Sequence, residues 1–220
     1  LRVLCVQEDN ADAVIQMLKG AMQQLQVGNP YLLKTDIGPV IDAEAQENIQ
    51  KHIDKMRQKG HRVHQLMRND AQDSELDAGT FITPTLIELP NLNDLEREVF
   101  GPVLHVIRFN QGSLKQLLEH INSKGYGLTM GLHTRIDETI QTVMTHAEVG
   151  NLYINRNIVG AVVGVQPFGG EGLSGTGPKA GGPIYLYRLM QNCSAKKLNK
   201  PFATGADLNP QVEFSNSALF

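Results

Sequence analysis

Two thiols and seven imidazoles are the side chains of this 220-residue chain best suited to nucleophilic or metal chemistry. Cys5 lies in the apolar stretch LRVLCV, which predicts a buried strand, and Cys193 lies far from it. Among the histidines only His61 and His64 are close in sequence, and no Cys or carboxylate completes a ligand set at metal spacing. We therefore expect no metal site, whereas Cys5 has to be weighed as a nucleophile. Two such distant cysteines form no disulfide framework, which favours a reducing cytoplasm.

A glycine-rich stretch late in the chain spells G-x-G-x-x-G at Gly170, Gly172 and Gly175. This spacing is typical of a pyrophosphate-binding loop only when an apolar strand precedes it and a helix follows. Here the residues QPFG precede it and TGPKAGG follow it, so neither condition is met. We expect these glycines to let the backbone turn tightly and approach a neighbouring group closely.

Two other segments could line a site. In LEREVFGPVLHVIRF, Glu98 and Phe100 stand just before a tight turn at Gly101–Pro102 and a buried strand. They could face a ligand, or they could be a surface glutamate and a core phenylalanine. In NLYINRNIVGAVVGVQPFGG, Gly160 and Gly164 bracket apolar residues without a clear period. Their backbone N–H groups could form a nest for an anion, or the segment could be a packed surface loop.

The elements that must position these residues follow from hydrophobic periodicity and turn signals. Asp9 or Asn10 can cap a first helix, and Asp42 can cap a second. Strands and helices alternate to about residue 155, which is typical of an α/β domain with a largely parallel sheet. Strands are expected at 3–7, 62–67, 80–89, 104–109, 127–134 and 152–155, and helices at 8–27, 42–60, 113–125 and 137–150.

Composition excludes several classes of protein. Hydrophobic residues make up 41% of the chain, and the formal net charge is −3, which argues against a nucleic-acid binder. No apolar run approaches the roughly 18 residues that a membrane span needs. No secretory signal is visible, so a cytoplasmic location is expected.

The two segments that could line a site strongly resemble the aldehyde dehydrogenase superfamily. EVFGPV matches the signature E-x-F-G-P-V, and NLYIN…PFGG…SG matches the late block of the same superfamily. The narrower variant INRNIVGAVVGVQPFGGEGLSGTGPKAGG looks like the 1-pyrroline-5-carboxylate dehydrogenase module of bifunctional proline utilisation A proteins. The likeness covers Leu1 to about Leu189. It implies the C-terminal part of an aldehyde-dehydrogenase-like catalytic domain over 1–189, followed by an irregular tail or oligomerisation arm over 190–220.

The resemblance implies roles for individual residues. Glu98 matches the glutamate that accepts hydrogen bonds from the nicotinamide ribose of NAD, and Phe100 matches the aromatic that positions the nicotinamide end. Gly160 and Ala161 match the loop that anchors the substrate carboxylate through backbone N–H groups. Some relatives carry a serine in place of Ala161. Without that hydroxyl, the backbone N–H groups would have to bind the carboxylate alone. Phe168 matches an aromatic beside the aliphatic stem of the substrate.

The resemblance also places the nucleophile outside this chain. The family's catalytic cysteine lies in a Gly-Gln-Arg-Cys-Ser-Ala segment that leads directly into a strand like LRVLCV. The nucleophile is therefore expected just upstream of Leu1, Cys5 inside the strand and Cys193 beyond the matching block. The general base and the pyrophosphate-binding helix would belong to a missing N-terminal half, so the chain is expected to be inactive alone.

The implied reaction is the NAD-dependent oxidation of L-glutamate γ-semialdehyde to L-glutamate through a cysteine thiohemiacetal and a thioester. The expected partners are this semialdehyde, the missing N-terminal half and further copies in a homo-oligomer. FAD would be needed only if a proline dehydrogenase module is fused upstream. Two alternatives stay open: a non-catalytic truncated module used for assembly or regulation, and a dehydrogenase for a different acidic semialdehyde.

Overall fold

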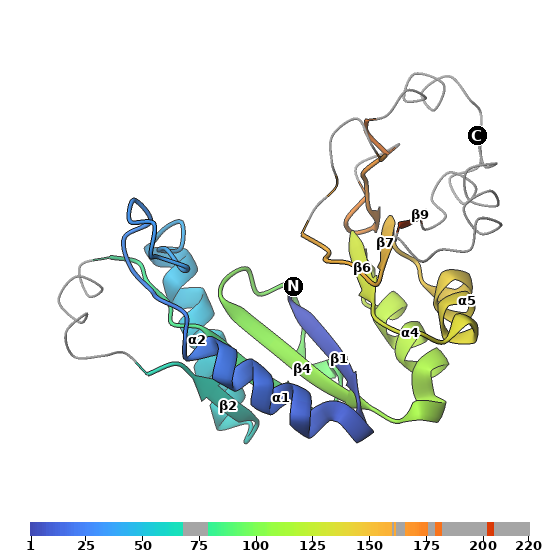
Figure 1. The fold of residues 1–220 in the computed structure, drawn as a ribbon. Coiled ribbons are helices and arrows are strands. Elements are labelled where there is room, and N and C mark those ends of the chain that lie inside the picture. Colours follow the sequence, from blue (N-terminus) through green and yellow to red (C-terminus); the bar gives the residue numbers. More distant parts are fainter. Residues whose placement is uncertain (68–78, 160, 162–165, 176–178, 182–201, 205–220) are drawn as a thin grey trace. The chain divides into compact units, whose positions relative to one another are not determined.

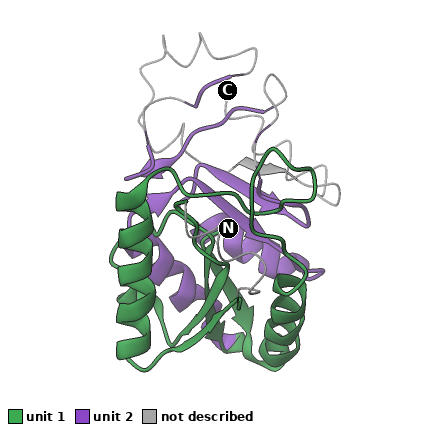
Figure 2. Cartoon of the chain, turned by 90° about the vertical axis from the view of Figure 1, so that its left-hand side faces the viewer, with its two compact units in different colours: residues 1–111 green, residues 112–220 purple. Residues whose placement is uncertain are grey.

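A computed structural model describes residues 1–67, 79–159, 161, 166–175, 179–181 and 202–204 (Figure 1). The chain divides into two compact units, Leu1–Gln111 and Gly112–Phe220 (Figure 2). The domain boundary expected at residues 189 and 190 lies outside the described residues. Each unit has its own sheet and its own helices, and each is considered in turn.

The first unit is built around a four-stranded sheet with the order β1-β4-β3-β2. β1 and β3 both run parallel to β4, and only β2 is antiparallel to its neighbour. Parallel neighbours require crossover connections, which α1 and the longer segments supply. The elements are β1 (Val3–Gln7), α1 (Glu8–Met22), α2 (Ala43–Gln58), β2 (Arg62–Gln65), β3 (Thr85–Leu89), the short 3₁₀ helix η1 (Leu92–Asp94) and β4 (Val103–Phe109).

The two helices of this unit cover opposite faces of the sheet, as Figure 2 shows. On one face, Val106 of β4 and Leu86 of β3 pack in a core cluster with Ala11 and Ile15 of α1. Side chains alternate across a strand, so His105 of β4 must point to the other face. There it meets His52 of α2. The sheet is therefore buried on both faces, as expected of parallel strands.

The first helix begins at Glu8 as predicted, but its predicted cap and its predicted C-terminal end were wrong. Asp9 and Asn10 lie inside α1, and its N-cap is Gln7, whose side chain makes no capping hydrogen bond. The helix ends at Met22, because the chain then turns back on itself. The backbone N–H of Gln26 donates to the Asp36 carboxylate at 2.9 Å, and the Gln26 carbonyl accepts from Asp36 N at 2.9 Å.

The predicted cap of the second helix is confirmed. Asp42 precedes α2 in an extended conformation, and its Oδ1 accepts from the backbone N–H of Ala45 at 2.8 Å. Gly60 follows the helix with a φ of +82°, a left-handed conformation in which glycine lacks the steric penalty of other residues.

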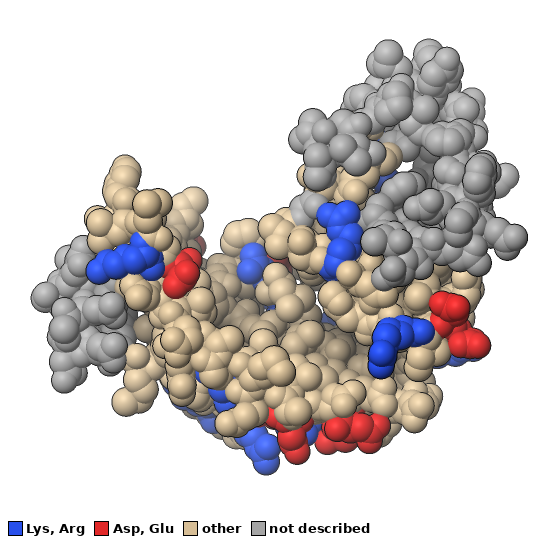
Figure 3. Space-filling view, in the orientation of Figure 1, with Lys and Arg blue, Asp and Glu red and all other residues tan. Residues whose placement is uncertain are grey.

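An arginine holds α1 to the sheet. Arg108 of β4 lies 2.7 Å from Asp12 and 3.2 Å from Glu8, both on α1, and 3.2 Å from Glu88 of β3. These hydrogen bonds raise the pKa of the Arg108 guanidinium above its usual value. Figure 3 shows positive and negative side chains interspersed on the face that it draws, outside its grey atoms.

The second unit has a three-stranded sheet, β6-β7-β9, in which every neighbouring pair is parallel. β5 and β8 form a separate antiparallel pair. The elements of the second unit are α4 (Leu114–Ser123), β5 (Tyr126–Gly127), β6 (Thr129–Leu132), α5 (Asp137–His146), β7 (Asn151–Ile154), β8 (Glu171–Gly172) and β9 (Phe202–Thr204). The 3₁₀ turn η2 (Gln111–Ser113) precedes α4.

Alternate residues of β7 serve the two sides of this sheet. Leu152 and Ile154 join a core cluster with Leu118 of α4 and Val143 of α5. Asn151 and Tyr153 point the other way, as strand geometry requires, and both are fully buried. Among the described residues, no helix is long and apolar enough to cross a lipid bilayer.

Candidate active site

Glu98 and Phe100 lie on the segment without regular secondary structure that links η1 to β4. Val99 between them is buried at 8% exposure, whereas the Glu98 side chain is 46% exposed and Phe100 is 74% exposed. The exposure of Glu98 and Phe100 on either side of buried Val99 shows that these two side chains face outward. Phe100 is thus a surface residue, and the alternative of a core phenylalanine was wrong.

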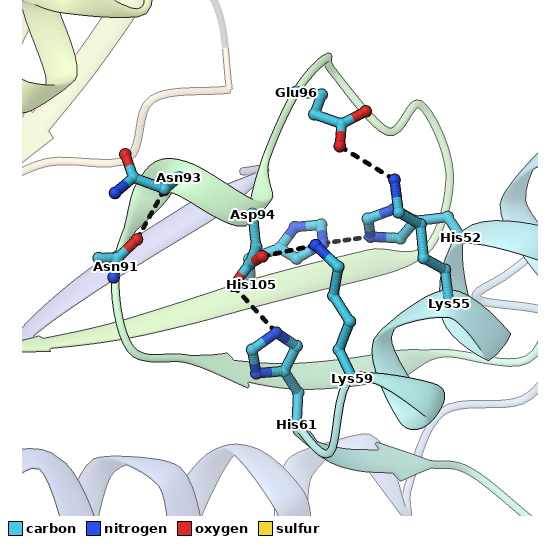
Figure 4. Close-up of polar contacts among 9 residues, drawn as sticks. All are labelled: His52, Lys55, Lys59, His61, Asn91, Asn93, Asp94, Glu96 and His105. Carbon is cyan, nitrogen blue, oxygen red and sulfur yellow. Dashed lines mark hydrogen bonds and ion pairs between the residues drawn. The ribbon is translucent and has the colours of Figure 1, made fainter.

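Ion pairs with α2 and the turn after it fix the start of this segment (Figure 4). Lys59 donates to Asp94 Oδ1 at 2.6 Å, and His61 Nε2 lies 3.0 Å from Asp94 Oδ2. Two residues further on, Lys55 donates to Glu96 Oε1 at 3.0 Å. Each exposed pair contributes little stability alone, but together they restrict the path that the chain takes toward Glu98.

The two carboxylates that accept from the lysines stay ionised near neutral pH. The hydrogen bond from Lys59 lowers the pKa of Asp94, and the hydrogen bond from Lys55 lowers the pKa of Glu96. Both carboxylates therefore remain ionised well below neutrality and keep accepting from Lys59 and Lys55.

Arg2 contacts Glu98, Phe100 and the turn that follows them. Its Nε donates to Glu98 Oε1 at 3.0 Å, and its guanidinium carbon lies 4.2 Å from the centre of the Phe100 ring. A third contact runs from Arg2 Nη1 to the Gly101 carbonyl at 3.4 Å. One cation thus contacts both residues for which the sequence suggested a cofactor-binding role, although the nearer of them, Glu98, is 96 positions away along the chain.

In the second unit, Phe168 lies on a turn that is hydrogen-bonded to Asn151 of β7. Asn151 donates through Nδ2 to the Pro167 carbonyl at 2.9 Å and accepts at Oδ1 from the Gly169 N–H at 3.2 Å. Phe168 also exchanges two backbone hydrogen bonds of 2.9 Å with Ala180. A single buried amide therefore fixes the residues on both sides of Phe168, which is itself half-buried.

A second buried pair supports the same turn. Gln166 donates through Nε2 to the Tyr153 hydroxyl at 3.0 Å, and both residues are buried. Burial raises the pKa of Tyr153, so its hydroxyl stays protonated.

Ala161 is half-buried, and Gly160 lies outside the described residues, so their predicted role toward a carboxylate stays a prediction.

The late glycines Gly170, Gly172 and Gly175 approach neighbouring backbone closely, which confirms the prediction that they allow tight turns and close approach. A methyl group on Gly170 would overlap the Ser174 carbonyl, and one on Gly150 would overlap the Gly169 carbonyl. Gly172 has a φ of +57° and pairs with Tyr126 in the short β5–β8 ladder. No helix begins within the described residues 166–175.

Cys5 lies in β1, at the edge of the described sheet, opposite Ile107 of β4. Burial raises the pKa of its thiol to about 11, so thiolate, the nucleophilic form, is scarce at neutral pH. Cys193 lies outside the described residues. Within the described part of the chain no group of three or more His, Cys, Asp or Glu could hold a metal ion.

Sequence reasoning missed Arg2 and Asn151 as parts of these sites. Asn151 could have been found, since it opens the NLYIN motif that precedes PFGG. Arg2 carries no such signal, because its partners are distant in sequence and are brought to it by the parallel pairing of β1 with β4.

Comparison with known proteins identifies the fold that carries these residues. The model described as "Aldehyde dehydrogenase family" matches residues 1–194. The chain belongs to the aldehyde dehydrogenase family. The curated bifunctional protein PutA of Klebsiella aerogenes is 61% identical over 204 residues, which cover 92% of this chain and 16% of that protein. The chain therefore spans about a sixth of the length of this relative.

Solved structures of the family agree with the fold described above. A mutant form of Bradyrhizobium japonicum proline utilization A superposes with a TM-score of 0.77 at 48% identity, covering 86% of this chain and 18% of that one. The 1-pyrroline-5-carboxylate dehydrogenase from Thermus with bound NAD gives 0.70 at 34% identity, covering 84% and 35%. The predicted α/β aldehyde-dehydrogenase-like fold with mostly parallel strands is confirmed.

Proposed function

We propose that this chain forms the C-terminal part of an NAD-dependent 1-pyrroline-5-carboxylate dehydrogenase, which oxidises L-glutamate γ-semialdehyde to L-glutamate in proline catabolism. The likeness to PutA over most of the chain supports the substrate class. The observation that carries the proposal is the outward-facing pair Glu98 and Phe100, held on an anchored segment at the start of β4.

The residues present fit the nicotinamide ribose of NAD. The Glu98 carboxylate is exposed, and a carboxylate can accept hydrogen bonds from both hydroxyls of a ribose diol. Phe100, two residues on, offers an exposed ring that can limit where the nicotinamide end lies. Bound NAD would supply the hydride acceptor. Glu98 would orient its ribose and Phe100 would restrict its nicotinamide end.

The second unit would bind the substrate. We assign the carboxylate anchor to the backbone N–H groups of Gly160 and Ala161, and the contact with the aliphatic stem to Phe168. Support comes from the fixed turn around Phe168, which buried Asn151 and Gln166 hold in place. An aromatic ring and a backbone anion nest would together suit a short substrate chain that ends in a carboxylate.

The remaining parts of the reaction are proposed to lie outside this chain. The cysteine that forms the thiohemiacetal and the thioester, the general base and the pyrophosphate site belong to the N-terminal half. FAD enters only with a fused proline dehydrogenase module. The division into a catalytic part over 1–189 and a tail over 190–220, the homo-oligomer and the cytoplasmic location stay proposals.

The test uses the full-length enzyme that contains this chain, with NADH formation as the readout. Glu98→Gln removes the charge of the ribose acceptor, so the KM for NAD⁺ should rise at least about tenfold, as for the loss of a charged hydrogen bond. Glu47→Gln, in an exposed pair with Lys51, is the matched control and should leave the KM unchanged. An unaltered KM in Glu98→Gln would contradict the assignment.

Two further measurements separate the alternatives. If kcat/KM for succinate semialdehyde clearly exceeds that for glutamate semialdehyde in the full-length enzyme, the proposed substrate is wrong. The isolated 220-residue chain should produce no NADH from NAD⁺ and glutamate semialdehyde. Measurable turnover by the isolated chain would show that the nucleophile lies within it.

A further inference from the structure

We propose that Arg2 is a positioning residue for the nicotinamide-ribose site, holding the Glu98 carboxylate and the Phe100 ring in one arrangement before the cofactor binds. The inference rests on the proposed function, because it takes Glu98 and Phe100 as the groups that meet the nicotinamide end of NAD. It adds a residue that itself need not touch the cofactor.

The three contacts of Arg2 restrain different parts of the segment. The Nε–H donates to Glu98 Oε1 at 3.0 Å, which fixes the carboxylate. The guanidinium plane lies over the Phe100 ring, with its carbon 4.2 Å from the ring centre. The Nη1 contact of 3.4 Å to the Gly101 carbonyl ties the following turn to the same side chain. A planar guanidinium can make these contacts together, whereas an ammonium is a point charge.

The backbone of Arg2 is itself fixed. The Arg2 carbonyl accepts from the backbone N–H of His105 at 3.0 Å, and His105 Nδ1 lies 3.2 Å from the same oxygen. Val3, the next residue, is in register with His105 in the parallel pairing of β1 and β4. The side chain of Arg2 therefore extends from a fixed backbone at the sheet edge to a surface segment. A side chain held in this way can restrain the residues that it contacts, Glu98 and Phe100.

Glu98 and Phe100 need such a restraint because they are exposed. A long exposed side chain samples several rotamers. If a ligand binds only one rotamer, its affinity is reduced in proportion to the fraction of molecules that hold this rotamer. The Arg2 contact uses Nε and one carboxylate oxygen, and a carboxylate offers about four lone-pair sites, so acceptor capacity for a ribose diol is retained. Arg2 would thus lower the ordering cost of binding without occupying the site.

The experiment compares Arg2→Met and Arg2→Lys with wild type in the full-length enzyme. In Arg2→Met the KM for NAD⁺ should rise at least about threefold, with a smaller rise in Arg2→Lys, because only arginine stacks and donates in a fork. The KM for glutamate semialdehyde should stay unchanged, as should inhibition by AMP, which lacks the nicotinamide ribose. Arg57→Met, which breaks an exposed pair with Asp54, is the control and should leave all these constants as in wild type.

A double-mutant cycle tests whether Arg2 acts through Glu98. Arg2→Met should raise the KM for NAD⁺ less in the Glu98→Gln background than in wild type, because coupled residues are not additive. Equal effects in both backgrounds would overturn the proposal. So would parallel losses of AMP inhibition and semialdehyde binding, which would indicate general damage to the fold. If wild type reduces NAD⁺ and Arg2→Met matches it, Arg2 is excluded and the proposed function stands. A full-length wild type that reduces no NAD⁺ would overturn both.

Discussion

The Nε2 atoms of His52 and His105 lie 2.9 Å apart, one on α2 and one on the face of β4 that α2 covers (Figure 4). His105 Nδ1 faces the carbonyl oxygen of Arg2, which can only accept, so Nδ1 carries the proton and Nε2 is the acceptor. His52 must then donate from its Nε2. This arrangement requires His105 to be neutral, because a protonated His105 would oppose its own Nε2–H to that of His52 across 2.9 Å.

Acid should therefore destabilise the first unit. Burial, with the neighbouring His52, lowers the pKa of His105 from 6.5 to about 4, although its hydrogen bond with Arg2 opposes the shift. Burial also lowers the pKa of His52, helped by Lys55 and Arg97. Between pH 6.5 and 4 the unfolded chain binds a proton on His105 that the folded chain does not. The free energy of unfolding should thus fall by up to about 3 kcal/mol as the pH drops through this window.

Denaturant unfolding of the chain at several pH values measures this effect. His105→Gln should show a lower stability at pH 7 but a shallower loss between pH 6.5 and 4 than wild type. His133→Gln removes an exposed imidazole and should keep the wild-type slope. If His105→Gln and wild type lose stability in parallel, the buried pair is not the source of the acid sensitivity.

The amide of Asn151 should matter for the semialdehyde and not for the cofactor. Asn151→Ala leaves the Gly169 N–H and the Pro167 carbonyl without their partner and loosens the turn that carries Phe168. In the full-length enzyme we expect the KM for glutamate semialdehyde to rise several-fold while the KM for NAD⁺ stays close to wild type. Asn157→Ala is the control, since Asn157 is exposed and its Oδ1 accepts from the nearby backbone N–H of Val159. A selective change in the KM for NAD⁺ would contradict this division of roles.

Two glycine-to-alanine substitutions should have opposite effects. A methyl group at Gly150 would overlap the Gly169 carbonyl, so Gly150→Ala should destabilise the chain by roughly 2 kcal/mol or more. Gly20 is exposed in the last turns of α1 and has no atom within 4 Å of an added methyl group. Gly20→Ala should stabilise the helix by about 0.5–1 kcal/mol. Thermal unfolding monitored by circular dichroism measures both, and a stabilised Gly150→Ala would show that the backbone there can relax.

Two isoleucines of the first unit provide a matched test of burial. Ile53 of α2 is fully buried, whereas Ile41, just before the helix cap, is 92% exposed. Ile53→Ala should lower the free energy of unfolding by about 2–5 kcal/mol, as expected for a core truncation. Ile41→Ala should change it by less than about 0.5 kcal/mol. Similar losses in both variants would show that Ile41 is covered in the folded protein.

Local patterns predicted the elements better than their ends. The alternation of strands and helices was right, and so was the Asp42 cap, because a capping side chain bonds only three residues away. The strand predicted from residue 80 begins at Thr85 in the structure. Pro84 has no N–H to donate to a ladder, so regular pairing starts after it. The first helix ended early because Asp36 and Gln26 hold the following loop, a contact between residues ten apart.

The sequence by itself determined the family, the α/β alternation and the candidates Glu98, Phe100 and Phe168, because these depend on periodicity and on contiguous motifs. Only the tertiary structure decided what holds those candidates. The parallel register of β1 on β4 brings Arg2 to Glu98, and the alternation of β7 turns Asn151 toward the residues around Phe168. Such contacts join residues far apart in the chain, and strand register, which no local pattern encodes, decides which side chains meet.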